Sequence, residues 1–450
     1  MNIDSLDPNV FAPVSREAWL KLVDRALKGA DFQEALVSRT DDGIAIEPLY
    51  ARRADAAPLA RRHTDRPWIV SQRMDDPDIE RAFIQLGDDL AKGCTGISLI
   101  SKASPSACGA GVGGNIETLA ARLAAAVSGN SISLRLDGFS PAFASASASA
   151  LGKSQHLPTM HFGLDVFASG STVQELTGSF ERLRDAGFAG TLFNADGRAV
   201  HNAGGTEAQE LAVVAAALVG HLKLLDKAGF APEVTLNAAS LCLSADQNQY
   251  ITMAKARAAR LLFARIAELC GISEPPAAHL YMETSYRMLS RLDPETNILR
   301  NTIAVFSAGT GGADEISVLP HSLTHGIPDP LARRLARNTQ TVLIAESHLD
   351  HVVDPAAGAG GIEALTEALA EKAWEIFGGI ERDGGLAGII ASGRLTAMVA
   401  EARTNRATKP IVGTTLFAAK AERPVVVAGE LGPVAECMGL TPVRLDEVAA

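Results

Sequence analysis

Cysteines and aromatic side chains are scarce in this chain of 450 residues, which has five Cys and only 5% Phe, Trp and Tyr. The five cysteines are scattered along the sequence and form no CxxC pair. This spacing excludes the usual zinc and redox motifs and is typical of reduced, buried thiols. Because reduced thiols persist in a reducing compartment, we expect a cytoplasmic location.

Long apolar runs and long basic runs are also missing. The longest apolar stretch, residues 211–220, is about half of a membrane span, and the acidic N-terminus lacks the apolar segment of a signal peptide. The net charge is -11, and no run of Lys and Arg is long enough to follow a phosphate backbone. We therefore expect neither nucleic acid nor a membrane as a partner.

The composition that remains, 47% hydrophobic and 21% charged, is that of a globular protein with an extensive core. From about residue 67, short apolar or β-branched runs alternate with longer helical patterns, which indicates βα units and a parallel sheet. The expected strands cover residues 96–101, 131–136, 160–166, 190–194, 234–238, 279–283, 304–307 and 315–319. The expected helices between them cover residues 116–127, 172–186, 206–228, 247–269, 297–305 and 330–347. Eight strands interleaved with helices predict a (β/α)8 TIM barrel of the α/β class, because eight is the number that closes.

The two ends of the chain differ from this βα pattern. Residues 15–30 predict an amphipathic helix that either packs on its own barrel or lies across a partner. After about Gly388, a helix over 389–403 and two short strands, 411–416 and 424–428, suggest an extension. We therefore predict an N-terminal arm over residues 1–45, the barrel over 46–388, and a C-terminal extension with a truncated linker over 389–450.

Three local motifs suggest ligand chemistry but fit loops better. The string GAGVGG, Gly109–Gly114, satisfies GxGxxG, yet eight residues separate it from the preceding strand and no acidic residue closes a second strand, so we expect a flexible βα loop. His348 and His351 could approach a metal together, although a polar helix end is the better interpretation. Glycine runs at 309–312 and 356–361 suit loops at a barrel rim.

Several longer strings resemble the methylmalonyl-CoA mutases. MAKARAARLLFA at residues 253–264 is similar to the family's helix "vaKlRAaRlLWa", and DPETNILRNT at 293–302 is similar to "DPyNNvvRtT". RPW at 66–68, ARNTQ at 336–340 and KPIVG at 409–413 follow in the family's order. The resemblance covers about residues 45–415. It implies a (β/α)8 barrel that in active members threads acyl-CoA along its axis and faces adenosylcobalamin held by a separate flavodoxin-like domain.

The departures from the family pattern fall on its chemical groups. The resemblance places Arg73 where active members carry a tyrosine, Arg198 and Ala199 where they carry a Tyr-His pair, His279 where they carry an arginine, and Ser317 and Leu319 where they carry a histidine and an asparagine. A radical rearrangement needs a dry, shaped cavity with hydrogen-bonding groups, and a fixed positive charge disturbs such a space. We therefore expect no catalytic, cofactor-binding or metal-binding residues in this chain, and a channel filled with side chains.

The resemblance thus implies a small, non-catalytic subunit of an adenosylcobalamin-dependent isomerase that interconverts methylmalonyl-CoA and succinyl-CoA. The implied partner is a large catalytic subunit that holds the cofactor, and we expect no cobalamin-binding domain in this chain. One alternative is a diverged acyl-CoA mutase barrel that is active with a separate cobalamin-binding chain. Another is a homodimeric binding module in which Arg73 and Arg198 hold an anionic ligand.

Overall fold

The barrel predicted from the sequence is confirmed by a computed structural model, which describes residues 14–59, 66–153, 157–168, 172–421 and 423–448. Eight parallel strands close in the order β10-β3-β4-β5-β6-β7-β8-β9. These strands are β3 (Ile69–Met74), β4 (Gly96–Ile100), β5 (Ser133–Asp137), β6 (Thr159–Leu164), β7 (Gly190–Asp196), β8 (Ala239–Ala245), β9 (His279–Thr284) and β10 (Glu315–Ser317).

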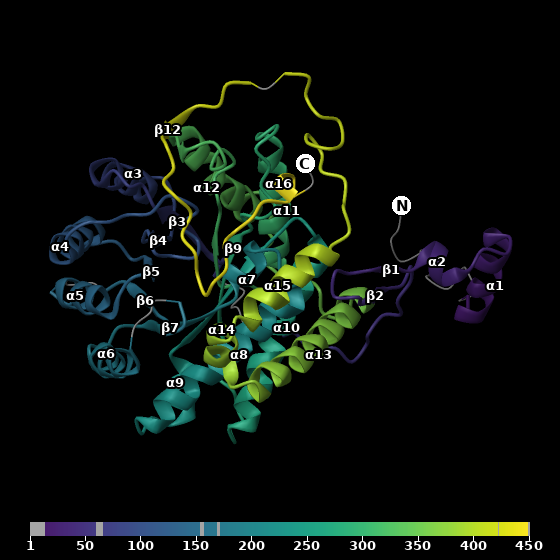
Figure 1. The fold of residues 1–450 in the computed structure, drawn as a ribbon, viewed down its shortest axis with the longest axis horizontal. Helices are drawn as coiled ribbons and strands as arrows, with labels where there is room; N and C mark the ends of the chain where they lie inside the picture. The colour runs from purple at the N-terminus through teal and green to yellow at the C-terminus, as the bar shows by residue number, and fades with distance from the viewer. Residues whose placement is uncertain (1–13, 60–65, 154–156, 169–171, 422, 449–450) are drawn as a thin grey trace, which may run out of the picture.

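Helices surround the barrel and connect consecutive strands (Figure 1). They are α3 (Ile79–Ala91), α4 (Ile116–Val127), α5 (Pro141–Leu151), α6 (Val173–Asp185), α7 (Arg198–Asn202), α8 (Glu207–Lys227), α9 (Pro232–Asn237), α10 (Gln249–Leu269), α11 (Thr296–Thr310) and α12 (Pro330–Ala345). Most begin at a residue whose side chain accepts a hydrogen bond from the first turn, for example Asp78, Asn115 and Thr206. Local capping therefore sets the starts of the helices that follow the strands.

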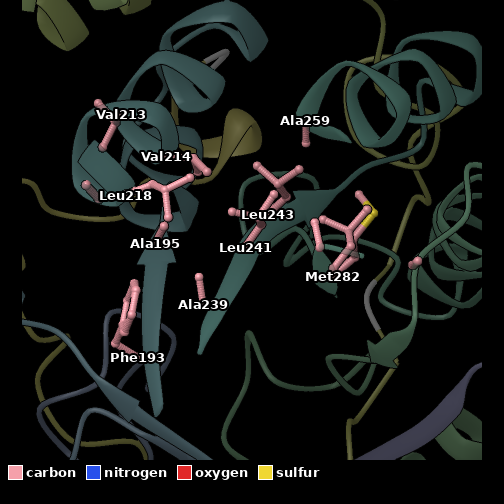
Figure 2. Packing of buried hydrophobic residues seen from close by; sticks show 14 of the residues in the cluster. Phe193, Ala195, Val213, Val214, Leu218, Ala239, Leu241, Leu243, Ala259 and Met282 are labelled. Atoms are coloured by element: carbon pink, nitrogen blue, oxygen red, sulfur yellow. The ribbon is translucent and has the colours of Figure 1, made fainter. Parts of the chain in front are cut away.

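The strands separate apolar and polar side chains by alternation. Figure 2 shows Leu241 of β8 among apolar side chains that include Val214 of α8 and Ala259 of α10. The intervening Ser240 and Cys242 point the other way, into the barrel, where both contact an arginine. Because successive residues of a strand face opposite sides, one strand supplies both the helix-facing core and the barrel interior.

Helix α8 is long and apolar enough to cross a membrane by length and composition alone. In the structure most of this helix is buried inside the protein. Fourteen residues from Glu207 to Leu225 are buried along it, and the helix packs against β7, β8, α10 and α13 (Gly360–Arg382). Its composition is therefore that of a core helix covered on several sides.

Three expected strands are wrong, and one strand of the barrel was missed. Residues 234–238 lie mostly in α9, because Pro232 begins a helix at its first turn, and the strand starts only at Ala239. Residues 304–307 belong to α11, and residues 411–416 form a turn with a single bridge between Val412 and Leu416. The missed strand is β3, whose sequence IVSQRM carries polar residues because it faces a polar barrel interior.

The region after the barrel is more helical than expected. Helix α13 was not predicted, although it spans 23 residues. The helix expected over 389–403 is broken into α14 (Gly385–Ala391) and α15 (Arg394–Asn405), because Gly393 adopts a φ of 72° between them. Residues 424–428 overlap β12 (Val427–Gly429), which pairs with β11 (Ile327–Pro328) in an antiparallel ribbon.

The N-terminal helices α1 (Arg16–Leu27) and α2 (Phe32–Leu36) bury no residue. Figure 1 shows them in purple, away from the barrel and beyond the small ribbon β1 (Ser38–Arg39) and β2 (Ala45–Ile46). Trp19 and Phe32 meet edge to face, with ring centroids 6.4 Å apart. Of the two placements left open by the sequence, the structure therefore has the helix away from its own barrel.

Four of the five cysteines are buried as expected, whereas Cys270, at the end of α10, is exposed.

Candidate functional site

Arg73 and Arg198 meet inside the mouth of the barrel, at the C-terminal ends of the strands. One Nη of Arg73 donates to Oε2 of Glu283, and Nη1 of Arg198 lies 3.5 Å from Oε1 of the same carboxylate. Arg73 is 1% exposed, Arg198 is fully buried and Glu283 is 2% exposed. A single carboxylate from β9 thus links the two arginines across the site.

Further carboxylates neutralise these arginines. Arg73 donates to Asp75 at 2.7 Å, and Arg198 donates to Asp137 at 2.7 Å and to Asp196. Burial by itself lowers the pKa of Arg73, but Glu283 and Asp75 raise it above its ordinary value. Burial raises the pKa of Asp137, but the charge of Arg198 together with hydrogen bonds from Ser104 and Arg198 lowers this pKa overall. Both arginines are therefore permanent cations whose donors are already occupied.

Tyr281 fills the next level of the interior. The guanidinium carbons of Arg198 and Arg135 lie 5.2 Å and 4.1 Å from its ring centroid, so two cations make cation–π contacts with this one ring. Burial first, and then the charge of Glu283, raise the pKa of the Tyr281 hydroxyl well above 10. Arg135 in turn donates to Glu315 at 3.1 Å. Tyr281 is therefore a neutral spacer within a stack of ion pairs.

The lowest level of the interior holds His161 of β6 and His279 of β9, whose ring centroids are 4.1 Å apart. Burial, followed by the charge of Arg135, lowers the pKa of His279 to about 4. Burial and His279 lower the pKa of His161 well below 6.5. Both imidazoles are therefore neutral near pH 7, and charged or aromatic side chains occupy the barrel from its mouth to this end.

The C-terminal segment covers the mouth from outside. The backbone N–H of Gly432 donates to Gly109, that of Val443 to Asn202, and that of Leu445 to Arg287, and each acceptor follows a different barrel strand. In Figure 1 this yellow segment runs from β12 across the barrel and returns to α16 (Leu445–Val448). Cys437 and Leu440 of this segment are buried, at 5% and 3% exposed. The chain itself therefore covers the C-terminal mouth of its barrel.

The structure separates the six positions singled out in the sequence. Arg73 and Arg198 come together, whereas His279 lies at the opposite end of the barrel interior. Ala199 is a buried apolar residue of α7, 4% exposed. The backbone N–H of Leu319 donates to Thr284, and the Ser317 hydroxyl has no hydrogen-bond partner within the described ranges. These positions therefore do not form one constellation.

Six residues that matter inside the barrel were missed from the sequence. They are Arg135, Asp137, Asp196, Tyr281, Glu283 and Glu315. A signal was available: polar side chains recur at every second position of otherwise apolar strands, as in SLRLD of β5. In a closed barrel this alternation marks the residues that point inward.

The glycine-rich and paired-histidine motifs fall outside the barrel interior. Within Gly109–Gly114, the N–H of Gly111 bonds to the carbonyl of Asp75, and the carbonyl of Gly109 accepts from Gly432. These backbone groups are therefore used within the chain. His348 and His351 lie after α12 as a stacked pair, with centroids 4.8 Å apart.

A cavity of about 190 Å³ lies off the barrel axis, between the N-terminal arm, the barrel rim and the residues after α15. Its lining includes Asp41, Glu207, Arg287 and Arg406. Arg287 is held by Glu207 at 2.9 Å and by Asp246 at 3.1 Å, and Arg406 pairs with Asp41. Arg406 also donates to the carbonyls of Gly204 and Gly205, so this residue of the extension links the arm to the barrel.

The closed (β/α)8 barrel and the sequence strings described above together define this fold as an acyl-CoA mutase-type barrel. The model of the family "Methylmalonyl-CoA mutase" matches residues 192–428, more than half of the chain. The chain belongs to the methylmalonyl-CoA mutase family.

Individual relatives carry a more specific name. The methylmalonyl-CoA mutase small subunit of Streptomyces virginiae is 33% identical over 97% of this chain and 75% of the relative. The small subunit of Propionibacterium freudenreichii subsp. shermanii is 30% identical over 88% of this chain and 66% of the relative. The probable small subunit of Mycobacterium bovis is 43% identical over 47% of this chain and 35% of the relative. The chain therefore aligns with between about one third and three quarters of the length of these relatives.

Proposed function

We propose that this chain is a small, non-catalytic subunit of a methylmalonyl-CoA mutase. In this proposal a large catalytic subunit binds adenosylcobalamin and acyl-CoA and interconverts methylmalonyl-CoA and succinyl-CoA. The names of the relatives support the subunit assignment. A cytoplasmic assembly fits the buried, unpaired thiols of most of its cysteines.

The observation that carries this proposal is the occupied barrel interior. Arg73, Glu283 and Arg198 form a continuous ionic contact across the mouth, in the place where active members need room for substrate. Opening that space would separate buried charges from their partners, which costs about 3–5 kcal/mol for a single broken pair. The interior therefore favours a supporting role over turnover.

The same contacts weigh against the two alternatives. A diverged barrel that is active with a separate cobalamin-binding chain requires an axial passage, yet Tyr281 and Arg135 are fully buried on the axis. A module that binds an anion through Arg73 and Arg198 requires free guanidinium donors, yet Asp75, Asp137, Asp196 and Glu283 occupy them. We therefore keep the subunit role as the proposed function.

Isothermal titration of the purified chain with methylmalonyl-CoA, and separately with adenosylcobalamin, tests the lack of a site. We expect no binding up to millimolar ligand, whereas the complex with the large subunit should bind both. Micromolar binding of either ligand by the chain alone would overturn the proposal. Co-expression with the large subunit, comparing wild type with Arg73→Tyr, should give equal turnover per assembled complex if the barrel interior takes no part in catalysis, because loss of the buried pairs acts on the stability of this chain.

A further inference from the structure

Two buried side chains and one half-buried side chain converge at the N-terminal end of the barrel interior without contacting one another by hydrogen bonds. They are His161 of β6, His279 of β9 and Glu315 of β10, and one potential ligand atom of each lies within 4.8 Å of those of the others. Nε2 of His161, Nε2 of His279 and Oε1 of Glu315 are buried and have no hydrogen-bond partner in the described part of the chain. Each of the three residues thus has an unpaired polar atom at this end of the interior, and Nε2 of His161 lies 4.0 Å from Oε2 of Glu315.

The opposite side of each group is held in place. Nδ1 of His161 lies 2.8 Å from the Thr191 hydroxyl, and Nδ1 of His279 lies 3.2 Å from the Ser240 hydroxyl. Nη2 of Arg135 also lies 3.5 Å from Nδ1 of His279, and because a guanidinium can only donate, this Nδ1 accepts from Arg135 in one tautomer. In the other tautomer each Nδ1 carries the proton, the hydroxyl oxygens accept it, and both Nε2 atoms have a free lone pair. Ligating histidines in proteins have this arrangement, with the second nitrogen oriented by an outer partner.

Leaving such atoms unpaired is unfavourable, since each buried donor or acceptor without a partner costs about 1–3 kcal/mol. We propose that His161, His279 and Glu315 bind a divalent transition-metal ion of the zinc and iron class. Two imidazoles and one carboxylate are the donor set that such ions accept, with a position left for water. A single buried water is the competing occupant, because it too could satisfy several polar atoms.

Binding requires the three groups to close around the ion. Metal–ligand distances of about 2.0–2.2 Å place neighbouring ligand atoms about 3.4 Å apart in a tetrahedral site. Nε2 of His161 and Oε2 of Glu315 are now 4.0 Å apart, so these groups must approach one another. His279 can move, because it is the only one of the three that is partly exposed, and it gives access from the end of the barrel. Arg135 donates to Oε2 of Glu315 at 3.1 Å, and its charge opposes a dication. We therefore expect weaker binding than in a site without a neighbouring cation.

The bound ion would connect strands that are not neighbours. In the barrel order β6 is separated from β9 by β7 and β8, whereas β9 and β10 are paired. An ion held by all three strands would brace the barrel across its interior. Its expected effect is thermal stabilisation of the folded chain, since a ligand that binds only the folded state raises its stability.

Titration of the full chain with Co²⁺ tests the site, because Co²⁺ reports its ligand geometry through visible absorption. The background variant His348→Asn/His351→Asn removes the stacked surface pair as an adventitious site. In that background, after treatment with a chelator, we expect one Co²⁺ per chain, displacement by Zn²⁺ and a higher midpoint of thermal unfolding. His161→Asn and Glu315→Gln should each lower the affinity at least tenfold, and Thr191→Val should lower it by about 10- to 100-fold through the outer hydrogen bond.

Absence of stoichiometric Co²⁺ binding in this background would overturn the proposal in favour of a buried water. Binding that survives His161→Asn would also overturn it. If the substituted chains do not fold, X-ray absorption of the Zn²⁺-loaded background variant decides: two imidazoles with oxygen donors support the site, and any other donor set overturns it. These outcomes are independent of association with a large subunit.

Discussion

At the scale of single residues, Glu283 is the carboxylate on which the barrel interior depends. It contacts Arg73 and Arg198 together, so Glu283→Gln leaves both guanidinium groups short of one negative charge. We expect a loss of about 3 kcal/mol in the free energy of unfolding, because removing one partner leaves buried charge uncompensated. Urea denaturation measures the loss. Glu268→Gln is the matched control, since its pair with Arg265 is 66% exposed on the Glu side and should contribute about 0.5 kcal/mol or less; equal effects of the two changes would contradict the prediction.

A second residue-scale prediction concerns pH. Burial first, and the charge of Asp196 among the further causes, raise the pKa of Asp165 to about 7, against about 4 in the unfolded chain. Between these values the folded chain holds a proton that the unfolded chain releases. The contribution of this carboxyl to stability is therefore complete below pH ~4 and is lost as the pH rises to about 7.

Asp165→Asn should remove this pH dependence. Between pH 5 and 7 we expect wild type to lose stability relative to Asp165→Asn by roughly 1 kcal/mol per pH unit, measured by urea denaturation at several pH values. Asp185→Asn serves as the control, because that carboxylate is 68% exposed and should track wild type. Parallel pH profiles for wild type and Asp165→Asn would show that the carboxyl is already ionised in the folded chain.

Residue identities inside the site were only partly predictable. Alternation along β5 marks Arg135 and Asp137 as inward-facing, and the family resemblance marks Arg73 and Arg198. Which carboxylate pairs with which arginine depends on register and on contacts across the barrel, as for Glu283, and no local pattern carries that information. The contact between His161 and His279 was unpredictable for the same reason, because β7 and β8 lie between their strands and only the closed barrel brings the two rings together.

At the scale of elements, β6 depends on one glycine. The register of β6 against β7 shifts between His161 and Leu164, and Gly163 adopts a φ of 63° at this irregularity. A Cβ at this position would overlap the carbonyl oxygen of Leu136 on β5. Gly163→Ala therefore combines backbone strain with a clash against a fixed neighbour.

We expect Gly163→Ala to lower the free energy of unfolding by about 2–5 kcal/mol, measured by chemical denaturation. Gly129→Ala separates the two causes, because Gly129 has a similar φ of 81° with nothing within 4 Å of its added Cβ. That control should cost about 1–2 kcal/mol from strain alone. If Gly163→Ala costs no more than Gly129→Ala, the irregularity in β6 relaxes to admit a side chain.

Elements were more predictable than their contacts. Six helices were placed within a few residues of their positions, because amphipathic periodicity and capping residues such as Asn115 and Thr206 are local signals. The strand β3 was missed because its inward-facing side chains are polar, which removes the apolar run expected of a buried parallel strand. A polar barrel interior is a property of the whole fold and leaves only an ambiguous pattern in any one strand.

At the scale of the whole molecule, the N-terminal arm is the part that the chain's own fold leaves uncovered. Helix α1 buries no residue, and Leu20 and Leu22 are 37% and 56% exposed. Its companion α2 reaches it mainly through Phe32, against Trp19. Leu20 and Leu22 are two residues apart and therefore point to nearly opposite sides of α1. Under the proposed subunit role, we expect both exposed leucines to be buried against the large subunit, since burial of exposed apolar side chains stabilises an association.

Replacing Leu20 and Leu22 by serine tests this association. The isolated chain should keep its thermal unfolding midpoint, because neither side chain is buried in it. The affinity for the large subunit, measured by titration calorimetry, should fall at least tenfold, since losing apolar anchors at an interface costs more than about 1.4 kcal/mol. Lys21→Ser lies between them on the same helix and should leave the affinity within about twofold. Unchanged binding of the double variant would place the partner surface elsewhere on the chain. Loss of binding with Lys21→Ser as well would show that fraying of α1, and not loss of its apolar contacts, weakens the association.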